Sequence, residues 1–361
     1  MRKYSSQIIW IVVGSITLLI RYTTTPSFIE AYYSRGLFIS IRKIIGAVSS
    51  WLPFPLIYLF FGLLVVWLVF RLIKVDWRAF QTWQGWGLAG LNIGAFLGGV
   101  VFFFFFLWGF NYGRIPFTKQ LGLTLKPIPV DTLFRKLEQQ TTEVLSLRRQ
   151  LAADQDTTLT VQPLPANLEA LARSSVKATL ADLGYPNQGM VRGRFLRPKG
   201  IFLRFSSAGL YWPFVGEGNI DSGLPHLQQP FTLAHEIAHG YGITNEGVCN
   251  FIAYLACQQS GNAYLQYSGK VAYWRYLAIA YQGLQKNKYW EYRNNLPAGF
   301  QADLEAINRT LAKYPDIMPR FRNFAYDQYL KSQGIAEGMA SYSQIIMLED
   351  AYGKRLMEEN K

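Results

Sequence analysis

The chain has 361 residues, half of them hydrophobic and 16% aromatic, with a formal net charge of +13. This length suffices for two or three structural units, and the apolar content exceeds that of an ordinary soluble domain. Residues 1–114 contain ten Lys and Arg residues but only two acidic residues, Glu30 and Asp76, so a basic surplus accompanies the most apolar part of the chain. Such a surplus favours contact with anionic lipid headgroups. No basic cluster or module typical of nucleic-acid binding occurs, so we expect no nucleic-acid partner.

Three apolar segments in the N-terminal third predict transmembrane helices. They are residues 8–20, 51–72 and 86–110, and the last contains five consecutive phenylalanines. The first has the basic start of a signal peptide but lacks a small-x-small cleavage site, so we expect a retained anchor. The mixed stretch 28–50 is expected to lie along the membrane surface. We therefore predict a membrane domain, residues 1–114, that is embedded in the lipid bilayer.

The flanking basic residues set the expected orientation. Lys and Arg are nearly balanced between the two sides, with the N-terminus and the loop after residue 72 slightly favoured as the inner side. Because three crossings put the two ends of the chain on opposite sides, the C-terminal domain is then expected outside. The oligomeric state stays open.

Beyond the third apolar segment the composition becomes that of a globular domain, residues 115–361. Helical periodicity predicts helices over 130–153 and 168–183. Aromatic and β-branched residues punctuated by glycine predict a strand within 209–221, and Ile201–Phe205 is expected to form another. The expected fold class is mainly α, with three N-terminal transmembrane helices followed by a mostly helical domain that holds a small β-sheet.

An H-E-x-x-H motif, His235-Glu236-Ile237-Ala238-His239, lies in a predicted helix. Residues four apart share a helical face, so both imidazoles are expected to point the same way, as two zinc ligands need. Glu236 then lies beside the metal as a general base. The simpler alternative is a buried helix whose histidines are merely hydrogen-bonded. Because two of the three histidines in the chain fall in this motif, we favour a metal site.

A catalytic zinc ion takes a third protein ligand and keeps one position open. We expect Glu246, seven residues after His239, to be this ligand; its alternative role is a carboxylate at a helix N-terminus. His226 is the second choice for the third ligand. Cys249 and Cys257 lie eight residues apart on one predicted helix, too far for a disulfide, and are expected to pack as small apolar side chains.

Two further segments are candidates for contacts with a substrate. Residues 209–221 are expected to supply an edge strand beside the motif helix, of the kind that pairs with an extended peptide. Within this stretch Glu217, Gly218 and Asn219 are the candidate substrate-binding residues. Tyr342 is the candidate hydrogen-bond donor to a tetrahedral intermediate, with packing in the core as its alternative role.

Several segments together resemble the DUF3810 family of bacterial membrane proteins. They are YYSRG at 32–36, NYGR at 111–114, GEGN at 216–219, the run PFTLAHEIAHGYG and the helix NFIAYLAC. The motif also resembles that of gluzincin-like zinc peptidases. These resemblances imply that His235 and His239 are metal ligands, Glu236 the base and Glu246 the third ligand. Combined with the expected orientation, they imply a multi-pass protein of the bacterial inner membrane with its catalytic domain on the periplasmic side.

We therefore expect a membrane-anchored zinc metallopeptidase that uses Zn²⁺ to hydrolyse a peptide or protein substrate. The alternative is a catalytically silent, zinc-stabilised scaffold or interaction protein. The intact Glu236 argues against that alternative, because metal retention alone requires no base. An intramembrane protease is disfavoured, since the apolar run around the motif is far too short to cross a bilayer.

Overall fold

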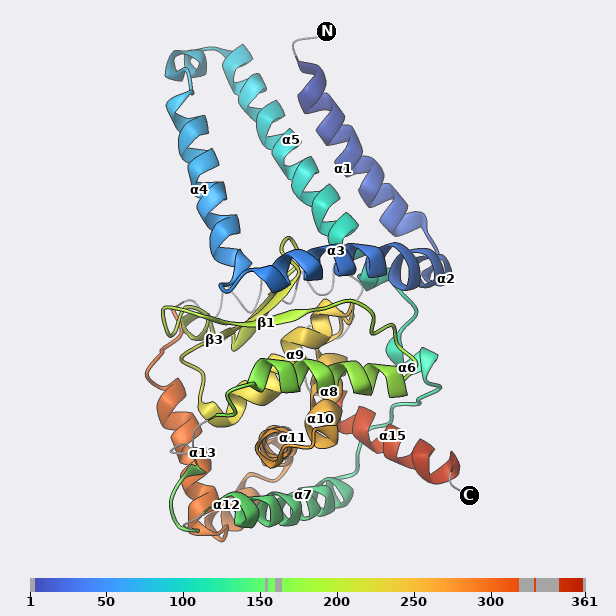
Figure 1. Cartoon of the computed structure of the whole chain (residues 1–361), viewed down its shortest axis with the longest axis vertical. Coiled ribbons are helices and arrows are strands. Elements are labelled where there is room, and N and C mark those ends of the chain that lie inside the picture. Colours follow the sequence, from blue (N-terminus) through green and yellow to red (C-terminus); the bar gives the residue numbers. More distant parts are fainter. Residues whose placement is uncertain (1–3, 153–154, 160–163, 318–327, 329–343, 360–361) are drawn as a thin grey trace. The chain divides into compact units, whose positions relative to one another are not determined.

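The structure is a computed structural model that describes residues 4–152, 155–159, 164–317, 328 and 344–359. The chain is mostly helical and contains one three-stranded sheet (Figure 1). It divides into two compact units. The first comprises Met1–Ile115 and Trp212–Gly216, and the second comprises Pro116–Tyr211 and Glu217–Lys361. The predicted class, mainly α with a small sheet and three N-terminal apolar helices, is confirmed.

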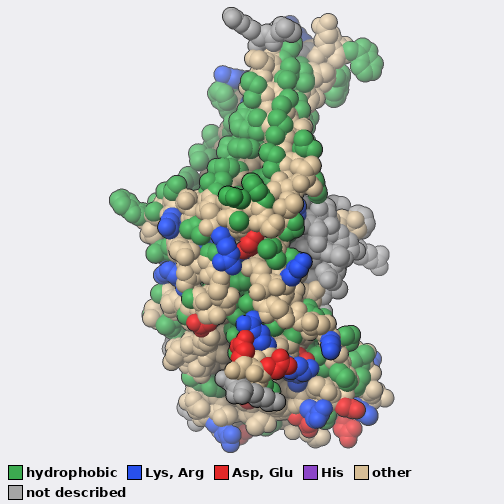
Figure 2. All heavy atoms as spheres, turned by 90° about the vertical axis from the view of Figure 1, so that its right-hand side faces the viewer, with side chains coloured by type: hydrophobic (Ala, Val, Ile, Leu, Met, Phe, Trp, Pro, Cys, Tyr) green, Lys and Arg blue, Asp and Glu red, His purple; other side chains and the backbone are tan. Residues whose placement is uncertain are grey.

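Three helices of the first unit are long and apolar enough to cross a membrane: α1 (Ser5–Thr23), α4 (Leu56–Ile73) and α5 (Trp83–Leu107). Hydrophobic side chains dominate their surface on the face that Figure 2 shows, as lipid contact requires. The second helix begins later than predicted because Pro55, at its N-cap, cannot lie inside the helix. The first helix packs along α5, where a Cβ on Gly98 would lie 2.2 Å from the Trp10 carbonyl oxygen.

The stretch between the first two apolar helices is helical almost throughout. It comprises α2 (Pro26–Phe28), the π-helical η2 (Ile29–Leu37) and α3 (Phe38–Trp51). In this stretch the buried carboxylate of Glu30 pairs with Arg114 at 2.6 Å and with Arg35 at 2.9 Å. Two short 3-10 helices, η3 (Trp77–Gln81) and η4 (Gly109–Gly113), flank α5.

Residues Trp212–Gly216 belong to the first unit although they follow it by almost a hundred residues. The ring of Phe60, in the second turn of α4, lies 5.7 Å from Trp212 and 5.5 Å from Phe214. Phe61 also contacts Trp212, at 5.3 Å between ring centroids. If three helices cross a membrane, the start of α4 and the chain after α5 lie on the same side, and these contacts agree with that topology.

The second unit contains eleven of the described helices, two of them 3-10 helices, and all three strands. They are α6 (Phe117–Gln120), α7 (Val130–Leu151), α8 (Leu168–Asp182), β1 (Arg192–Leu196), η6 (Leu203–Phe205), β2 (Gly209–Trp212), β3 (Glu217–Asp221), η7 (His226–Gln228), α9 (Gln229–Gly240), α10 (Glu246–Gln259), α11 (Ala263–Leu284), α12 (Lys286–Asn294), α13 (Ala298–Leu311) and α15 (Ile345–Glu359), with the last residue of β2 shared with the first unit. Helices α7 and α8 confirm two predictions to within two residues.

The strand predicted at Ile201–Phe205 is wrong. The carboxylate of Asp221 accepts hydrogen bonds from the backbone N–H groups of Gly200, Phe202 and Leu203, at 2.8, 2.8 and 3.2 Å. These bonds hold the segment as a turn and a short 3-10 helix, because N–H groups that bind one carboxylate cannot also form a strand ladder. The strand of this region is the earlier β1.

The glycine-rich segment 209–221 forms two strands rather than one. The sheet order is β1-β3-β2, and β1 runs parallel to β3 with Arg192 opposite Glu217. Since β3 has a neighbour on both sides and every one of its residues is buried, Glu217, Gly218 and Asn219 lie in the middle of the sheet. The expectation that they form a substrate-binding edge is therefore wrong, because their backbone groups already face two neighbouring strands. The strand of this segment that lies at a sheet edge is β2.

Helix α9 carries the motif and is buried along its whole length. It packs against α8, α10, β1 and β3. At Gly218 the strand β3 meets the helix backbone so closely that a Cβ would lie 2.8 Å from the carbonyl carbon and oxygen of Glu236. The absence of a side chain at Gly218 therefore allows the backbones of β3 and the motif helix to approach one another.

Replacing Gly218 with Ala is expected to destabilise the protein, because the new methyl group would overlap backbone atoms that cannot rotate away. Overpacking of this kind costs about 1–3 kcal/mol of unfolding free energy. Thermal unfolding should show a lower midpoint for this variant. Gly283→Ala is the matched control, since a Cβ there meets nothing within 4 Å. Equal midpoints for the two variants would show that the contact between β3 and α9 is looser than described.

Candidate metal centre

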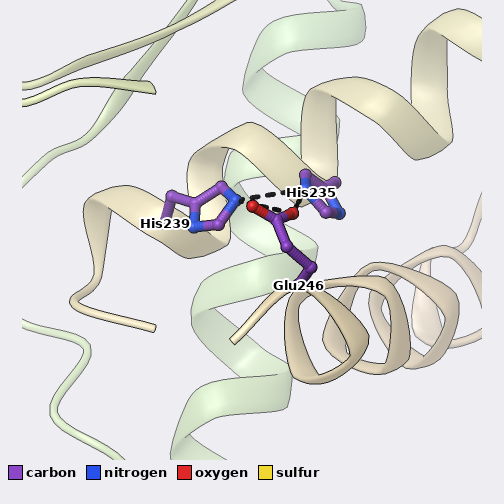
Figure 3. Close-up of side chains that lie close together, drawn as sticks. All are labelled: His235, His239 and Glu246. Carbon is purple, nitrogen blue, oxygen red and sulfur yellow. Dashed lines mark hydrogen bonds and ion pairs between the residues drawn. The ribbon is translucent and has the colours of Figure 1, made fainter. Parts of the chain in front are cut away.

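The two histidines of the motif project from α9 one turn apart, and Glu246 reaches them from the next helix (Figure 3). The chain reverses between the helices at Gly242, whose φ of +88° is readily adopted only by glycine. Asn245 then caps α10, because its Oδ1 accepts a hydrogen bond from the Val248 N–H at 3.0 Å. This cap starts the helix at Glu246 and aims its side chain back at the motif.

The three candidate ligand atoms form a nearly equilateral triangle. His235 Nε2 lies 3.1 Å from His239 Nε2 and 3.1 Å from Glu246 Oε2, and His239 Nε2 lies 3.4 Å from Glu246 Oε2. Ligands at the usual zinc bond lengths are about 3.3 Å apart in a tetrahedral site. The observed separations match this value, so the group could hold a metal ion.

The Nδ1 atom of each imidazole, which points away from the other ligand atoms, is hydrogen-bonded to an acceptor. His239 Nδ1 donates to the Ile243 carbonyl oxygen at 2.9 Å, and His235 Nδ1 donates to Asn250 Oδ1 at 2.8 Å. In each neutral ring the Nε2 atom then carries a lone pair that faces the other ligand atoms. Two lone pairs at this separation repel one another unless a cation or a proton lies between them. The arrangement therefore fits a metal ion, whose histidine ligands are oriented by such outer hydrogen bonds.

The charges of His239 and Glu246 shift each other's pKa. Burial disfavours the Glu246 carboxylate, but His239 and His235 outweigh burial and hold the pKa of Glu246 below its ordinary value. Burial likewise opposes the His239 cation, while the adjacent Glu246 carboxylate raises the pKa of His239 above the ordinary value. In the absence of metal, a proton on His239 therefore stabilises the group, and a metal ion has to displace it.

Cys249 is buried as predicted, but its thiol also lies 3.3 Å from His239 Nδ1. Burial raises the pKa of the Cys249 thiol to about 11, so this side chain stays neutral. A neutral thiol on the outer nitrogen of His239 is a neighbour of the ligand and not a ligand itself.

Glu236 is held on the strand side of the helix. A Cβ on Gly209 of β2 would lie 2.6 Å from its Oε1 atom, and the backbone N–H of Tyr211 donates to its carboxylate. Burial raises the pKa of Glu236 above the ordinary value, opposed by the nearby His235 and His239. A buried carboxylate with a raised pKa beside a metal-binding group is suited to accepting and returning protons.

Two residues of this centre were not predicted from the sequence. Asn250 lies on α10 one turn after Glu246, and Tyr276 of α11 hydrogen-bonds to it. The four-residue spacing from Glu246 to Asn250 is a signal that sequence reasoning could have used, since it puts both side chains on one helical face. No such signal marks Tyr276, because its position depends on how α11 packs.

Replacing Asn250 with Leu is expected to weaken metal binding about 10- to 100-fold, since loss of an outer hydrogen bond frees the ligand ring to rotate. Asn250→Asp, which keeps an acceptor for His235 Nδ1, is the matched control and should bind metal at least as tightly as the wild type. Competition with a chromogenic chelator measures both affinities. Equal affinities for the Leu and Asp variants would contradict the role of Asn250 in orienting His235.

The other predicted site residues lie elsewhere. His226, the second choice for the third ligand, is exposed and outside the metal-binding group. Glu217 pairs with Arg194 at 3.2 Å, and Asn219 Nδ2 donates to the Glu217 carbonyl oxygen at 3.1 Å. Tyr342 lies outside the described residues.

The fold and the centre define a class of protein: mostly helical, with three helices able to cross a membrane and a buried His-His-Glu group able to hold a metal ion. The model of the family described as "Protein of unknown function (DUF3810)" matches residues 33–348. The chain belongs to the DUF3810 family, as its motifs predicted. Neither the curated proteins nor the solved structures contain a match.

Proposed function

We propose that this protein is a membrane-anchored, zinc-dependent metallopeptidase. The observation that carries the proposal is the buried carboxylate of Glu236 beside three side chains spaced as the ligands of one metal ion. Two imidazoles and one carboxylate, with a fourth position left for water or substrate, are a donor set typical of catalytic zinc. Other divalent transition metals accept the same donors, so zinc is part of the proposal.

Each residue then has a defined task. His235, His239 and Glu246 would hold the ion, and a bound ion would polarise the scissile carbonyl and lower the pKa of water toward neutrality. Glu236 accepts a proton from the attacking water and passes it to the departing amine. The backbone N–H of Tyr211 donates a hydrogen bond that fixes the carboxylate, and burial raises the pKa of Glu236, which favours transient protonation. Tyr342 remains the proposed donor to the tetrahedral intermediate.

A structural metal site is the second candidate, and one observation favours it. His235, His239, Glu236 and Glu246 are each no more than 8% exposed, and structural zinc sites are closed. Structural sites, however, usually have four protein ligands. Among the described residues only three candidate ligands gather here. The carboxylate of Glu236, buried next to them but outside the group of three, favours catalysis, because a scaffold gains nothing from burying that charge.

The proposed setting is the bacterial inner membrane. Helices α1, α4 and α5 are the proposed anchors in the lipid bilayer, with the N-terminus inside and the metal centre on the periplasmic side. The proposed substrate is a peptide or protein on that side.

The proposal is tested with the full chain in lipid nanodiscs. Metal content is measured first, and hydrolysis of a quenched fluorescent peptide library is then followed before chelation, after chelation and after zinc is restored. We expect hydrolysis that disappears with the chelator and returns with zinc. A zinc-loaded protein that cleaves nothing in the library would favour the structural candidate.

A further inference from the structure

A basic loop, Arg197 to Phe205, exposes both cations and large apolar side chains. Its exposed cations are Arg197, Lys199 and Arg204. Ile201 and Phe205 lie among them and are 37% and 44% exposed. Neither the proposed metal chemistry nor the packing of the fold requires this combination, since the loop side chain that packs in the interior is that of Leu203.

The buried side chain of Asp221 holds the conformation of the basic loop. This carboxylate is fully buried and accepts three backbone N–H groups of the loop, with Gly223 N–H as a fourth donor at 2.7 Å. Gly200 packs so tightly that a Cβ would lie 2.3 Å from the ring of Tyr314. The loop therefore presents its exposed side chains in a fixed arrangement, which lowers the entropy lost when a partner binds.

We propose that the basic loop docks on the anionic surface of the bilayer, with Arg197, Lys199 and Arg204 at the phosphate level and Ile201 and Phe205 inserted between headgroups. Cations flanking apolar tips are the composition of segments that lie in a membrane interface. An acidic protein partner would match the cations, but a lipid surface accounts for both kinds of side chain.

A short stretch of chain connects the basic loop to a residue that packs on a membrane-spanning candidate helix, and this limits the distance between the loop and the bilayer. Trp212 is the seventh residue after Phe205, and a fully extended chain of seven steps spans at most about 25 Å. Trp212 packs on Phe60 and Phe61 of α4, a helix able to cross a membrane. A bilayer that contains α4 therefore lies within the reach of this short connection. The inference does not depend on the metal or on peptide hydrolysis.

The test places a label on the loop in the full chain. Phe205→Cys is labelled with an environment-sensitive fluorophore; Cys249 and Cys257 are buried and so protected from the reagent. In nanodiscs of mixed zwitterionic and anionic phospholipid, brominated acyl chains should quench this label several-fold more than a label at the exposed Glu291→Cys in α12. Equal quenching of the two labels would overturn the proposal.

Charge is tested by a matched pair of double variants. Arg197→Glu with Lys199→Glu should reduce quenching at position 205 to the level of the label at 291. Lys286→Glu with Lys288→Glu, two exposed residues of α12, changes the net charge equally and should leave the quenching unchanged. Quenching as strong in purely zwitterionic nanodiscs, or unaffected by the loop variant, would overturn recognition of anionic lipid. Unfolding midpoints equal to the wild type confirm that both variants fold.

Discussion

Glu236→Gln should abolish peptide hydrolysis while leaving the metal bound. The amide has nearly the same shape and still accepts the N–H of Tyr211, but it cannot take a proton from water. Loss of a general base costs about 10²- to 10⁴-fold in rate. The measurement pairs cleavage of the best library peptide with metal content on the same preparation. A normal rate in this variant would show that Glu236 is not the base.

A matched control separates this effect from the loss of a surface charge. Glu305→Gln removes a carboxylate from α13 that is 64% exposed and only loosely paired with Arg309. Its rate and metal content should equal those of the wild type. If Glu236→Gln lost metal as well as activity, the carboxylate would be part of the metal site, and the scaffold alternative would gain support.

His239→Ala is expected to remove the metal and with it a large part of the stability of the second unit. The variant keeps one imidazole and one carboxylate, too few donors for tight binding at a tetrahedral site. A ligand present at a thousand times its dissociation constant stabilises the folded state by about 4 kcal/mol. Zinc should therefore raise the unfolding midpoint of the wild type by several degrees and leave that of the variant unchanged.

The chain offers a direct control in its third histidine. His226 is exposed at the start of η7, so His226→Ala should retain both the metal and the zinc-dependent rise in midpoint. If His226→Ala lost the metal and His239→Ala retained it, His226 and not His239 would be the metal ligand. A His239→Ala protein that still binds zinc at full affinity would show that the triangle of ligand atoms does not hold the ion.

Local patterns in the sequence were enough to predict the motif helix, the three apolar helices and helices such as α7 and α8. The reason is that helical periodicity, hydropathy and the four-residue spacing of His235 and His239 act within one segment. These helices depend mainly on neighbours along the chain and were confirmed, whereas the equally local strand pattern at Ile201–Phe205 was overridden by a tertiary contact. The start of α4 was missed by a few residues because Pro55 has a steric effect that hydropathy does not show.

The tertiary structure decided the rest, because it depends on which segments meet. Glu246 faces the histidines only because Gly242 reverses the chain and Asn245 starts the next helix in that register. Glu217 became an internal ion-pair partner because Arg194 lies on the neighbouring strand. The turn at Ile201 exists because Asp221, 18 to 21 residues further along the chain, accepts hydrogen bonds from the backbone around it. By itself the sequence determined which residues could bind a metal ion; tertiary packing decided which of them come within ligand distance, because only packing brings separate segments together.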